Sequence, residues 1–241
     1  MDALQAIIDK GKRIVFFGGA GVSTASGIPD FRSGEGLYAK RYGGLTAEMM
    51  LSQSFFYLHP DLFYAFYRAH MLHPDAEPNV VHRKLAEMER AGKLTGLVTQ
   101  NIDGLHRQAG NRLVYELHGS VHDNACLECG RHYGLDYILR TEGVPKCESC
   151  GGVVKPSVVL YGEELDHYVS TGACREISRC DVLIVAGTSL TVEPAASMLA
   201  YFRGGARKLV VINREETRAD ERAALVIRED MARVMENLRI E

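Results

Sequence analysis

The sequence predicts an α/β fold in which a Rossmann-like parallel sheet carries helices on both faces. Short apolar segments suited to buried strands recur along the chain, at 13–17, 94–98, 113–117, 181–186 and 208–212. Stretches with helical spacing of apolar residues separate several of them, which is typical of parallel strands joined by crossover helices. A glycine-rich loop follows the first segment and polar side chains follow the others, as at the ligand-binding edge of such a sheet.

Length and composition fit one globular domain, or a main domain with a smaller module inserted into it. The chain has 241 residues, 46% hydrophobic and 24% charged, which is enough to bury a sizeable core. A net charge of −3 argues against direct nucleic-acid binding, because no basic field covers the chain. No apolar run approaches the about 18 residues that span a bilayer, and the stretch 1–12 has helical spacing with acidic residues. We therefore expect a cytoplasmic protein that binds no membrane and keeps its cysteines reduced.

The first apolar segment runs directly into the glycine-rich stretch 18–24. Glycines let the backbone approach a phosphate, and a helix that begins at Val22 or Ser23 would point free amide groups at it. The pattern favours the pyrophosphate of a dinucleotide, although a tight turn without a ligand has the same composition. Thr24 replaces the third glycine of the usual fingerprint, and the acidic residue that usually holds the adenine ribose is missing.

The next stretch, 26–33, interrupts any long helix, because Pro29 disfavours helical geometry at Ile28. It places Asp30, Phe31 and Arg32 beside the predicted phosphate site. We expect it to fold over the cofactor, with Phe31 covering a ring and Arg32 paired with phosphate or Asp30.

Residues 45–92 have the spacing of helices and contain a cluster of aromatic side chains. The cluster most simply fits core packing, although a small helical module against the lid would also offer an apolar pocket. The gap between the first two strands is too long for a simple crossover, so the sequence predicts an insertion here.

The second strand ends in Gln100, Asn101 and Asp103. In an open parallel sheet these side chains would form the floor of a site, although asparagine and aspartate are also common in plain turns. His118 follows the next strand beside Gly119, where catalytic groups collect, and its ordinary pKa suits a general base near neutral pH.

Four cysteines have the spacing of a tetrahedral zinc site. Cys126 and Cys129 form one C-x2-C pair, and Cys147 and Cys150 form a second pair after 17 intervening residues. A redox pair explains only half of this pattern, and a zinc ribbon that binds nucleic acid is a further alternative. Four cysteine ligands leave no open position for water, so we expect a structural Zn2+.

Three later segments add polar or extended features. Val158 to Tyr161 is extended and could pair with a peptide as an exposed edge, or be an ordinary return strand. Thr188 and Ser189 follow one C-terminal strand and Asn213 follows another, and these residues could bind ribose or phosphate.

Two motifs carry a family resemblance. Gly19-Ala-Gly-Val-Ser23 with Gly27-Ile-Pro-Asp-Phe-Arg32, and the segment Thr99-Gln-Asn-Ile-Asp103, resemble signatures of the sirtuins, the NAD-dependent protein lysine deacylases. His118, the cysteine pairs and the C-terminal motifs follow in the family's order, so that the resemblance covers about residues 10–238.

The resemblance implies one catalytic domain over 1–241. Its large Rossmann-like part would comprise about 1–27, 76–119 and 164–241. Its small module would comprise a helical insertion, about 28–75, and a zinc ribbon with four cysteine ligands, about 120–163.

The resemblance also implies the reaction and its residues. Such a protein consumes NAD, deacetylates lysine in proteins or peptides bound in extended form, and releases nicotinamide and O-acetyl-ADP-ribose. His118 and Asn101 would be catalytic, with His118 as the base. The implied NAD contacts are Ala20, Thr24, Phe31, Arg32, Gln100, Ile102, Asp103, Thr188, Ser189, Asn213 and Asp230. The implied acyl-lysine contacts are Val159, Leu160, Tyr161 and Tyr67.

One departure bears on the acyl group. Relatives that favour acidic acyl groups carry Tyr-x-x-Arg, whereas Tyr67-Arg-Ala-His70 has histidine in place of the arginine. Losing a bidentate cation weakens carboxylate recognition, so we expect neutral acyl groups such as acetyl to be preferred over succinyl. An NAD-dependent ADP-ribosyltransferase remains an alternative, as does a zinc-ribbon binding module on a nucleotide-binding fold.

Overall fold

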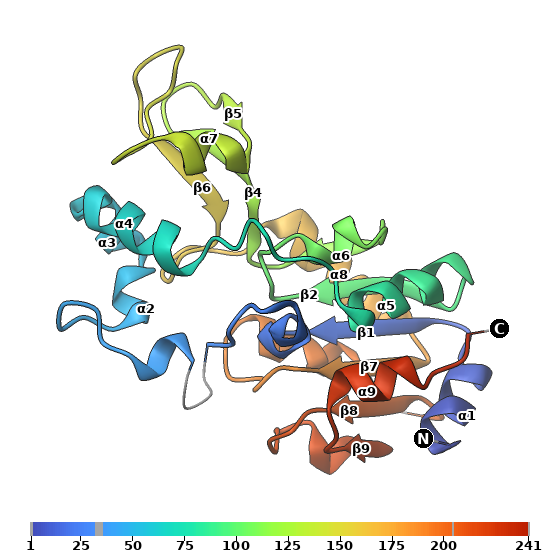
Figure 1. Cartoon of the computed structure of the whole chain (residues 1–241). Coiled ribbons are helices and arrows are strands. Elements are labelled where there is room, and N and C mark those ends of the chain that lie inside the picture. The colour runs from blue at the N-terminus through green and yellow to red at the C-terminus, as the bar shows by residue number, and fades with distance from the viewer. Residues whose placement is uncertain (1, 32–35, 204, 241) are drawn as a thin grey trace.

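A six-stranded parallel sheet forms the centre of the molecule, in the strand order β3-β2-β1-β7-β8-β9 (Figure 1). The computed structural model describes residues 2–31, 36–203 and 205–240. The strands are β1 (Ile14–Gly18), β2 (Leu94–Thr99), β3 (Val114–Glu116), β7 (Val182–Ala186), β8 (Lys208–Ile212) and β9 (Leu225–Ile227). The predicted α/β class and its parallel sheet are confirmed.

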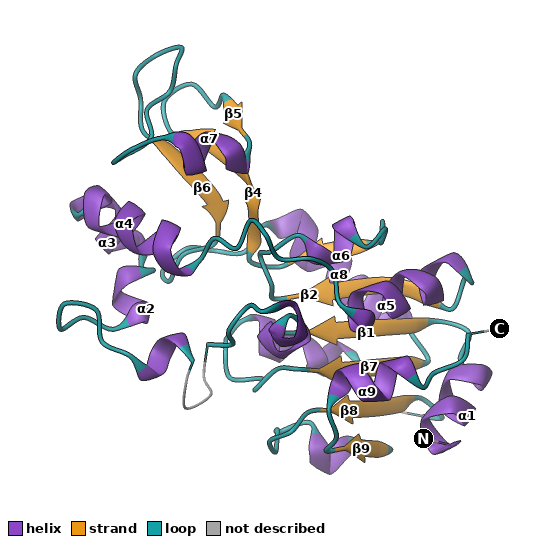
Figure 2. Ribbon diagram, in the orientation of Figure 1, coloured by secondary structure: helices purple, strands orange, loops and turns teal. Residues whose placement is uncertain are grey.

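Helices cover both faces of this sheet (Figure 2). One face packs against α1 (Asp2–Lys10), α5 (Val80–Arg90) and α9 (Met231–Glu236). The other packs against α8 (His167–Arg179) and the 3-10 helix η4 (Ala195–Tyr201). In the part of the chain that the structure describes, no helix has the length and apolar character needed to cross a membrane.

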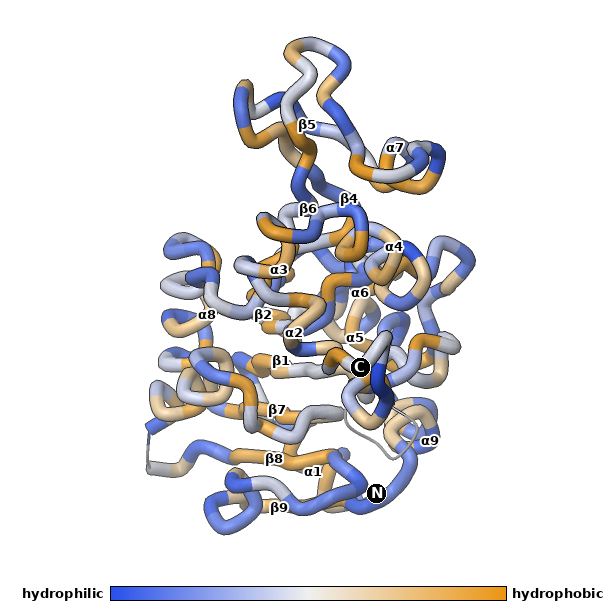
Figure 3. Tube along the Cα trace, turned by 90° about the vertical axis from the view of Figure 1, so that its left-hand side faces the viewer, coloured by the Kyte–Doolittle hydropathy of each residue, from blue (hydrophilic) through white to orange (hydrophobic). Residues whose placement is uncertain are grey.

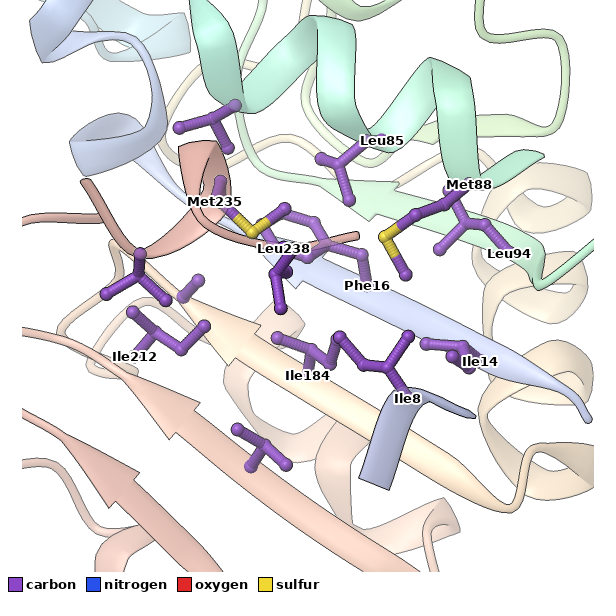
Figure 4. Close-up of a cluster of buried hydrophobic side chains, with 14 of the residues drawn as sticks. Ile8, Ile14, Phe16, Leu85, Met88, Leu94, Ile184, Ile212, Met235 and Leu238 are labelled. Atoms are coloured by element: carbon purple, nitrogen blue, oxygen red, sulfur yellow. The ribbon is translucent and has the colours of Figure 1, made fainter. Parts of the chain in front are cut away.

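The central strand β1 shows why the sheet is buried on both sides. Ile14 and Phe16 join the cluster under α5 and α9, drawn in Figure 4, whereas Val15 and Phe17 join the cluster under α8. Side chains of a strand alternate between faces, so a strand covered twice must be apolar throughout. Figure 3 shows the resulting hydrophobic band along β1, β7 and β8. Truncating a fully buried phenylalanine such as Phe16 to alanine costs about 3–5 kcal/mol in such a core.

A smaller assembly stands apart from the sheet and has its own hydrophobic cluster. It contains an antiparallel sheet in the order β5-β4-β6, made of β4 (Gly119–Cys126), β5 (His132–Tyr133) and β6 (Val154–Val158). Its helices are α2 (Ala47–Met50), α3 (Gln53–Leu58), α4 (Pro60–His70) and α7 (Leu135–Arg140), and α6 (Leu105–Gln108) follows β2 beside α5. We name this assembly, made of α2–α4, α7 and β4–β6, the small module.

One expected element is wrong. No α-helix begins at Val22 or Ser23, because the chain forms two 3-10 turns there, Ala20–Val22 and Thr24–Ser26. The second turn ends at Gly27 with φ +82°, a conformation that glycine adopts without strain, and Pro29 follows. The glycine loop therefore continues as a compact irregular segment.

The strand register aligns the carboxyl ends of the central strands. Gly18 pairs with Thr99 on one side and with Ala186 on the other, and Ala186 pairs with Ile212. The residues that follow these strands therefore meet at one edge of the sheet, where ligands bind in open parallel sheets.

Candidate active site

A cleft of about 650 Å³ runs along this edge and continues beside the small module. Most of the predicted site residues line it. They are Ala20, Thr24, Phe31, Gln100, Asn101, Ile102, Asp103, His118, Val159, Leu160, Tyr161, Thr188, Ser189, Asn213 and Asp230. The structure thus brings together segments that are far apart in the sequence, as the strand-end argument predicts.

Apart from the four cysteines, two predicted site residues stand outside this set. Tyr67 is fully buried in α4, stacked on Phe63 with ring centroids 5.4 Å apart, and does not line the cleft. Its helical spacing turns it into the core, and its proposed contact with an acyl group stays a prediction. His70, one turn further along α4, does line the cleft. Arg32 lies outside the described residues.

Close packing of two loops determines the glycine-rich end of the cleft. A Cβ atom added to Gly19 would lie 2.7 Å from Cβ of Thr188, and one added to Gly21 would lie 2.8 Å from Cα of Gly187. The amide of Gly21 donates to the carbonyl of Gly187 at 2.9 Å. These glycines are therefore needed for the contact between loops, in addition to any approach of a ligand.

A buried polar network lies beneath the middle of the cleft, centred on Ser23. The Ser23 hydroxyl donates to Oδ2 of Asp103 at 2.6 Å and accepts from Nδ2 of Asn101 at 3.0 Å. His82 is fully buried, and its Nε2 lies 3.5 Å from the same hydroxyl. Ser23 thereby fixes two of the strand-end side chains relative to each other.

The start of α5 orients His82 and so orients the network. Asn79 caps the helix, accepting from the amide of Val81 at 2.8 Å, and its own amide donates to Nδ1 of His82 at 3.2 Å. Because Nδ1 accepts, Nε2 carries the proton and can donate to Ser23. Burial lowers the pKa of His82 to about 4, so the ring is neutral at pH 7. The Asn-x-x-His spacing resembles a capping box and was the available sequence signal for this role.

His118 follows β3 and faces the cleft from a half-buried position. Its Nδ1 lies 2.9 Å from the main-chain oxygen of Gln100. A carbonyl can only accept, so Nδ1 carries the proton and the neutral ring keeps a lone pair on Nε2. Burial lowers the pKa of His118, and the hydrogen bond to Gln100 opposes this change in part. The ring is thus held as a neutral base near pH 7.

The side chain of Gln100 links two strand ends. Its Nε2 donates to Oγ1 of Thr188 at 2.9 Å, and the same oxygen accepts from the amide of Leu190 at 3.2 Å. Leu190 has φ +55°, which a non-glycine residue adopts rarely. The turn 187–190 is therefore held by the side chain of Gln100, which follows β2, and by the hydroxyl of Thr188.

The segment 159–161 differs from an exposed edge, one of the two alternatives that its sequence left open. The amide of Val159 donates to the His118 carbonyl at 3.0 Å, and that of Tyr161 to the Leu51 carbonyl at 3.0 Å. The amide of Leu160 donates to the carboxylate of Glu163 at 2.9 Å. All three amides are thus engaged within the chain, and these N–H groups are not a free edge for a peptide.

The far end of the cleft contains Asn213 and Asp230. Asn213 donates from Nδ2 to the Glu215 carbonyl at 3.0 Å. Asp230 caps α9 and pairs with Arg214 at 2.5 Å. Hydrogen bonds from the helix amides and the contact with Arg214 lower the pKa of Asp230. Both side chains therefore have fixed positions on the wall of the cleft.

The four predicted metal ligands come together at the tip of the small module. The sulfurs of Cys126, Cys129, Cys147 and Cys150 all lie within 4.8 Å of one another. A tetrahedral zinc with Zn–S bonds of about 2.3 Å needs sulfurs roughly 3.8 Å apart, so the set fits one Zn2+ with no open position. Gly130 and Gly151 follow the pairs with φ +72° and +76°, which turns the chain back at each.

Several lining residues escaped the sequence analysis. Tyr38, Lys40, Tyr42 and His73 join His70 on the wall of the cleft. A tertiary contact brings the segment 36–46 to the cleft wall. The ring of Tyr42 packs edge-on against that of Phe66 in α4, with ring centroids 4.7 Å apart. No spacing in the sequence marks such a contact.

Known proteins are similar to this chain in sequence and in fold. The model of the Sir2 family matches residues 19–194, which include the glycine loop, the strand-end cluster, His118 and the cysteines. The chain belongs to the Sir2 family. It is 49% identical to an NAD-dependent protein deacetylase of Clostridium acetobutylicum, over 99% of this chain and 97% of that protein. It is 53% identical to an NAD-dependent protein deacetylase of Cutibacterium acnes, over 95% of this chain and 93% of that protein.

Solved Sir2 structures match the whole fold. A complex of Sir2 with a p53 peptide and NAD+ matches with TM-score 0.87 and 35% identity, over 98% of this chain and 95% of that one. A complex of a Sir2 variant with deacetylated p53 peptide and 3′-O-acetyl ADP ribose matches with TM-score 0.90 and 35% identity, over 98% and 96%. The predicted family is confirmed along nearly the full length.

Proposed function

We propose that this Sir2 chain is an NAD-dependent protein lysine deacetylase that releases nicotinamide and O-acetyl-ADP-ribose. One observation carries the proposal. A single cleft joins the glycine loop, the Asn101–Asp103 cluster and His118, and deacetylase relatives share about half of the sequence over nearly its full length.

NAD would lie along the carboxyl edge of the sheet. We place its adenosine beside Asn213 and Asp230, its pyrophosphate at Ala20 and Thr24, and its nicotinamide ribose near Gln100. Phe31 would cover the nicotinamide end. The Ser23 hydrogen bonds hold Asn101 and Asp103 in place, so that Asp103 and Ile102 can receive the nicotinamide.

The acyl-lysine would enter between Tyr161 and His118, with Val159 and Leu160 beside its side chain. Its acyl oxygen attacks C1′ of the nicotinamide ribose as nicotinamide leaves. His118 then takes a proton from a ribose hydroxyl through Nε2, and that oxygen attacks the acyl carbon. Water completes the release of lysine, and the acetyl group stays on ADP-ribose. The oriented, neutral imidazole supports this role.

Neutral acyl groups would be preferred. His70 lines the cleft where a fixed cation would be needed for a carboxylate. Burial and the nearby Lys40 and His73 lower the pKa of His70, which favours its neutral form. Lys40 is exposed on a long flexible side chain, so it would hold a carboxylate less firmly than an arginine does.

The zinc would be structural. Four cysteines would saturate its coordination, and two of them, Cys126 and Cys147, belong to the same hydrophobic cluster as Leu160. Zinc would thereby keep the small module folded and the substrate segment in position, and it would take part in no chemical step.

The chain would form one catalytic domain of two parts, working in the cytoplasm on proteins that present lysine in an extended segment. Separate hydrophobic clusters support a large part of about 1–27, 76–119 and 164–241 and a small module of about 28–75 and 120–163. We expect no direct nucleic-acid binding, given the net charge of −3.

The test incubates the purified protein with NAD and an acetyl-lysine peptide, and follows all products by mass spectrometry. We expect free lysine peptide, nicotinamide and O-acetyl-ADP-ribose in equal amounts. A peptide that gains an ADP-ribose instead would indicate the transferase alternative, and no NAD-dependent product would contradict the proposal.

A further inference from the structure

Two tyrosine hydroxyls meet at the wall of the cleft. Oη of Tyr38 lies 2.5 Å from Oη of Tyr161, one donating and the other accepting. The two residues are 123 positions apart, and both line the cleft. Their contact joins a segment that follows the glycine loop to a segment that follows β6.

Tyr38 is tied to the side of the cleft where we place NAD. Its amide donates to the Phe31 carbonyl at 2.8 Å, and the two rings lie 5.3 Å apart. The amide of Leu37 donates to the Asp30 carbonyl at 3.2 Å. A ligand that holds Phe31 therefore also restrains Tyr38.

Tyr161 is tied to the side where we place the acyl-lysine. Its amide donates to Leu51, and its carbonyl accepts from the amide of Gln53 at 2.9 Å. Two residues earlier, the amide of Val159 donates to the carbonyl of His118. A peptide that settles against Tyr161 therefore acts on a segment joined directly to the catalytic histidine.

We propose that the Tyr38–Tyr161 bridge is a positioning element that couples the binding of NAD to the binding of the acyl peptide. This inference rests on the proposed function. The bridge forms only when both segments occupy the positions seen here, so a ligand that stabilises one segment favours the position of the other. Coupling of this kind is reciprocal, because each ligand must raise the affinity for the other by the same factor.

The hydroxyls carry this link, and the aromatic rings do not. Replacing either tyrosine with phenylalanine keeps the ring on the cleft wall and removes the bridge. A neutral hydrogen bond of this kind changes an equilibrium by about two- to tenfold, which sets the size of the expected coupling.

The experiment measures equilibrium coupling without turnover. Isothermal titration calorimetry gives the Kd of an acetyl-lysine peptide with and without saturating ADP-ribose, which is NAD without its nicotinamide. The proteins are the wild type, Tyr38→Phe, Tyr161→Phe and the double variant, each checked for folding by circular dichroism. Tyr57→Phe, an exposed tyrosine on α3 away from the cleft, is the matched control.

In the wild type and Tyr57→Phe, ADP-ribose should tighten peptide binding. The ratio of the peptide Kd without ADP-ribose to the Kd with ADP-ribose measures the coupling. In Tyr38→Phe and in Tyr161→Phe this ratio should fall about two- to tenfold. In the double variant the ratio should fall no further, because the same single bridge is lost in all three proteins. Equal ratios in all five proteins, or additive losses in the double variant, would overturn the coupling. A wild type that binds neither ligand would instead contradict the proposed function.

Discussion

The Nδ1 atom of His118 lies 2.9 Å from the main-chain oxygen of Gln100, so the imidazole that we propose as the base is oriented by a residue at the end of β2 that lines the same cleft. Because this contact fixes the proton on Nδ1, the proposed role of His118 as base requires the unprotonated Nε2. Burial lowers the pKa of His118 below its ordinary value.

This relationship predicts the pH profile. Protonation removes the base, so kcat/KM for the acetyl peptide should fall as the pH drops through the lowered pKa. The rate should be nearly level above about pH 6.5, the ordinary histidine value. Initial rates between about pH 5 and 8.5 give the profile, with folding followed by circular dichroism. An acid limb centred above about pH 7.5 would be inconsistent with a buried neutral base.

Removing the Ser23 hydroxyl should damage the nicotinamide side of the cleft. Ser23→Ala takes away the partner of Asp103 and Asn101 and leaves His82 buried beside a methyl group. An unpaired buried polar group costs about 1–3 kcal/mol, so kcat/KM for NAD should fall roughly 5- to 150-fold. Steady-state kinetics in NAD give the value, and Ser54→Ala on the exposed face of α3 is the control. Unchanged NAD kinetics in Ser23→Ala would show that the network has no part in the site.

Loss of zinc should reduce deacetylation while ADP-ribose binding is retained. Elemental analysis should find one zinc per chain, held by the four clustered cysteines. In Cys129→Ser the small module should loosen and deacetylation should fall at least tenfold, because Leu160 packs in the same hydrophobic cluster as Cys126 and Cys147. ADP-ribose should still bind, since the sheet and its two clusters are separate. Cys174→Ser lies on α8 outside the cluster and should retain metal and activity; a metal-free protein with full activity would refute the structural role.

Acetyl-lysine peptides should be turned over at least tenfold faster than succinyl-lysine peptides. His70 lines the cleft at the position where relatives that favour acidic acyl groups carry an arginine. The pKa of His70 is lowered, which favours the neutral ring at pH 7. A His70→Arg variant supplies a fixed charge and should shift the ratio of kcat/KM toward succinyl. Faster turnover of succinyl-lysine by the wild type would reverse the assignment of acyl preference.

The sheet was predictable because its strands are covered on both faces. The segment 13–17 predicts β1 to within one residue of Ile14–Gly18, and 208–212 matches β8. Continuous apolar runs of this length have few other uses in a globular domain. The strand-end rule then places Gln100, Asn213 and His118 on one cleft without any knowledge of packing.

The errors arise where tertiary contacts overrule local pattern. Glycines at 19 and 21 predict a helix start facing a ligand, whereas their nearest neighbours are Gly187 and Thr188 of another loop. The amide of Tyr161 donates to the carbonyl of Leu51, a long-range hydrogen bond that no residue spacing in the sequence predicts.

The most direct measurement compares wild type with His118→Ala in a single assay of NAD, acetyl-lysine peptide and product. The wild type should convert peptide and NAD into deacetylated peptide and O-acetyl-ADP-ribose. The variant should bind NAD with a similar Kd, measured by calorimetry, and form product at least a hundredfold more slowly, because it lacks the base. A His118→Ala protein that forms O-acetyl-ADP-ribose at the wild-type rate would contradict the account.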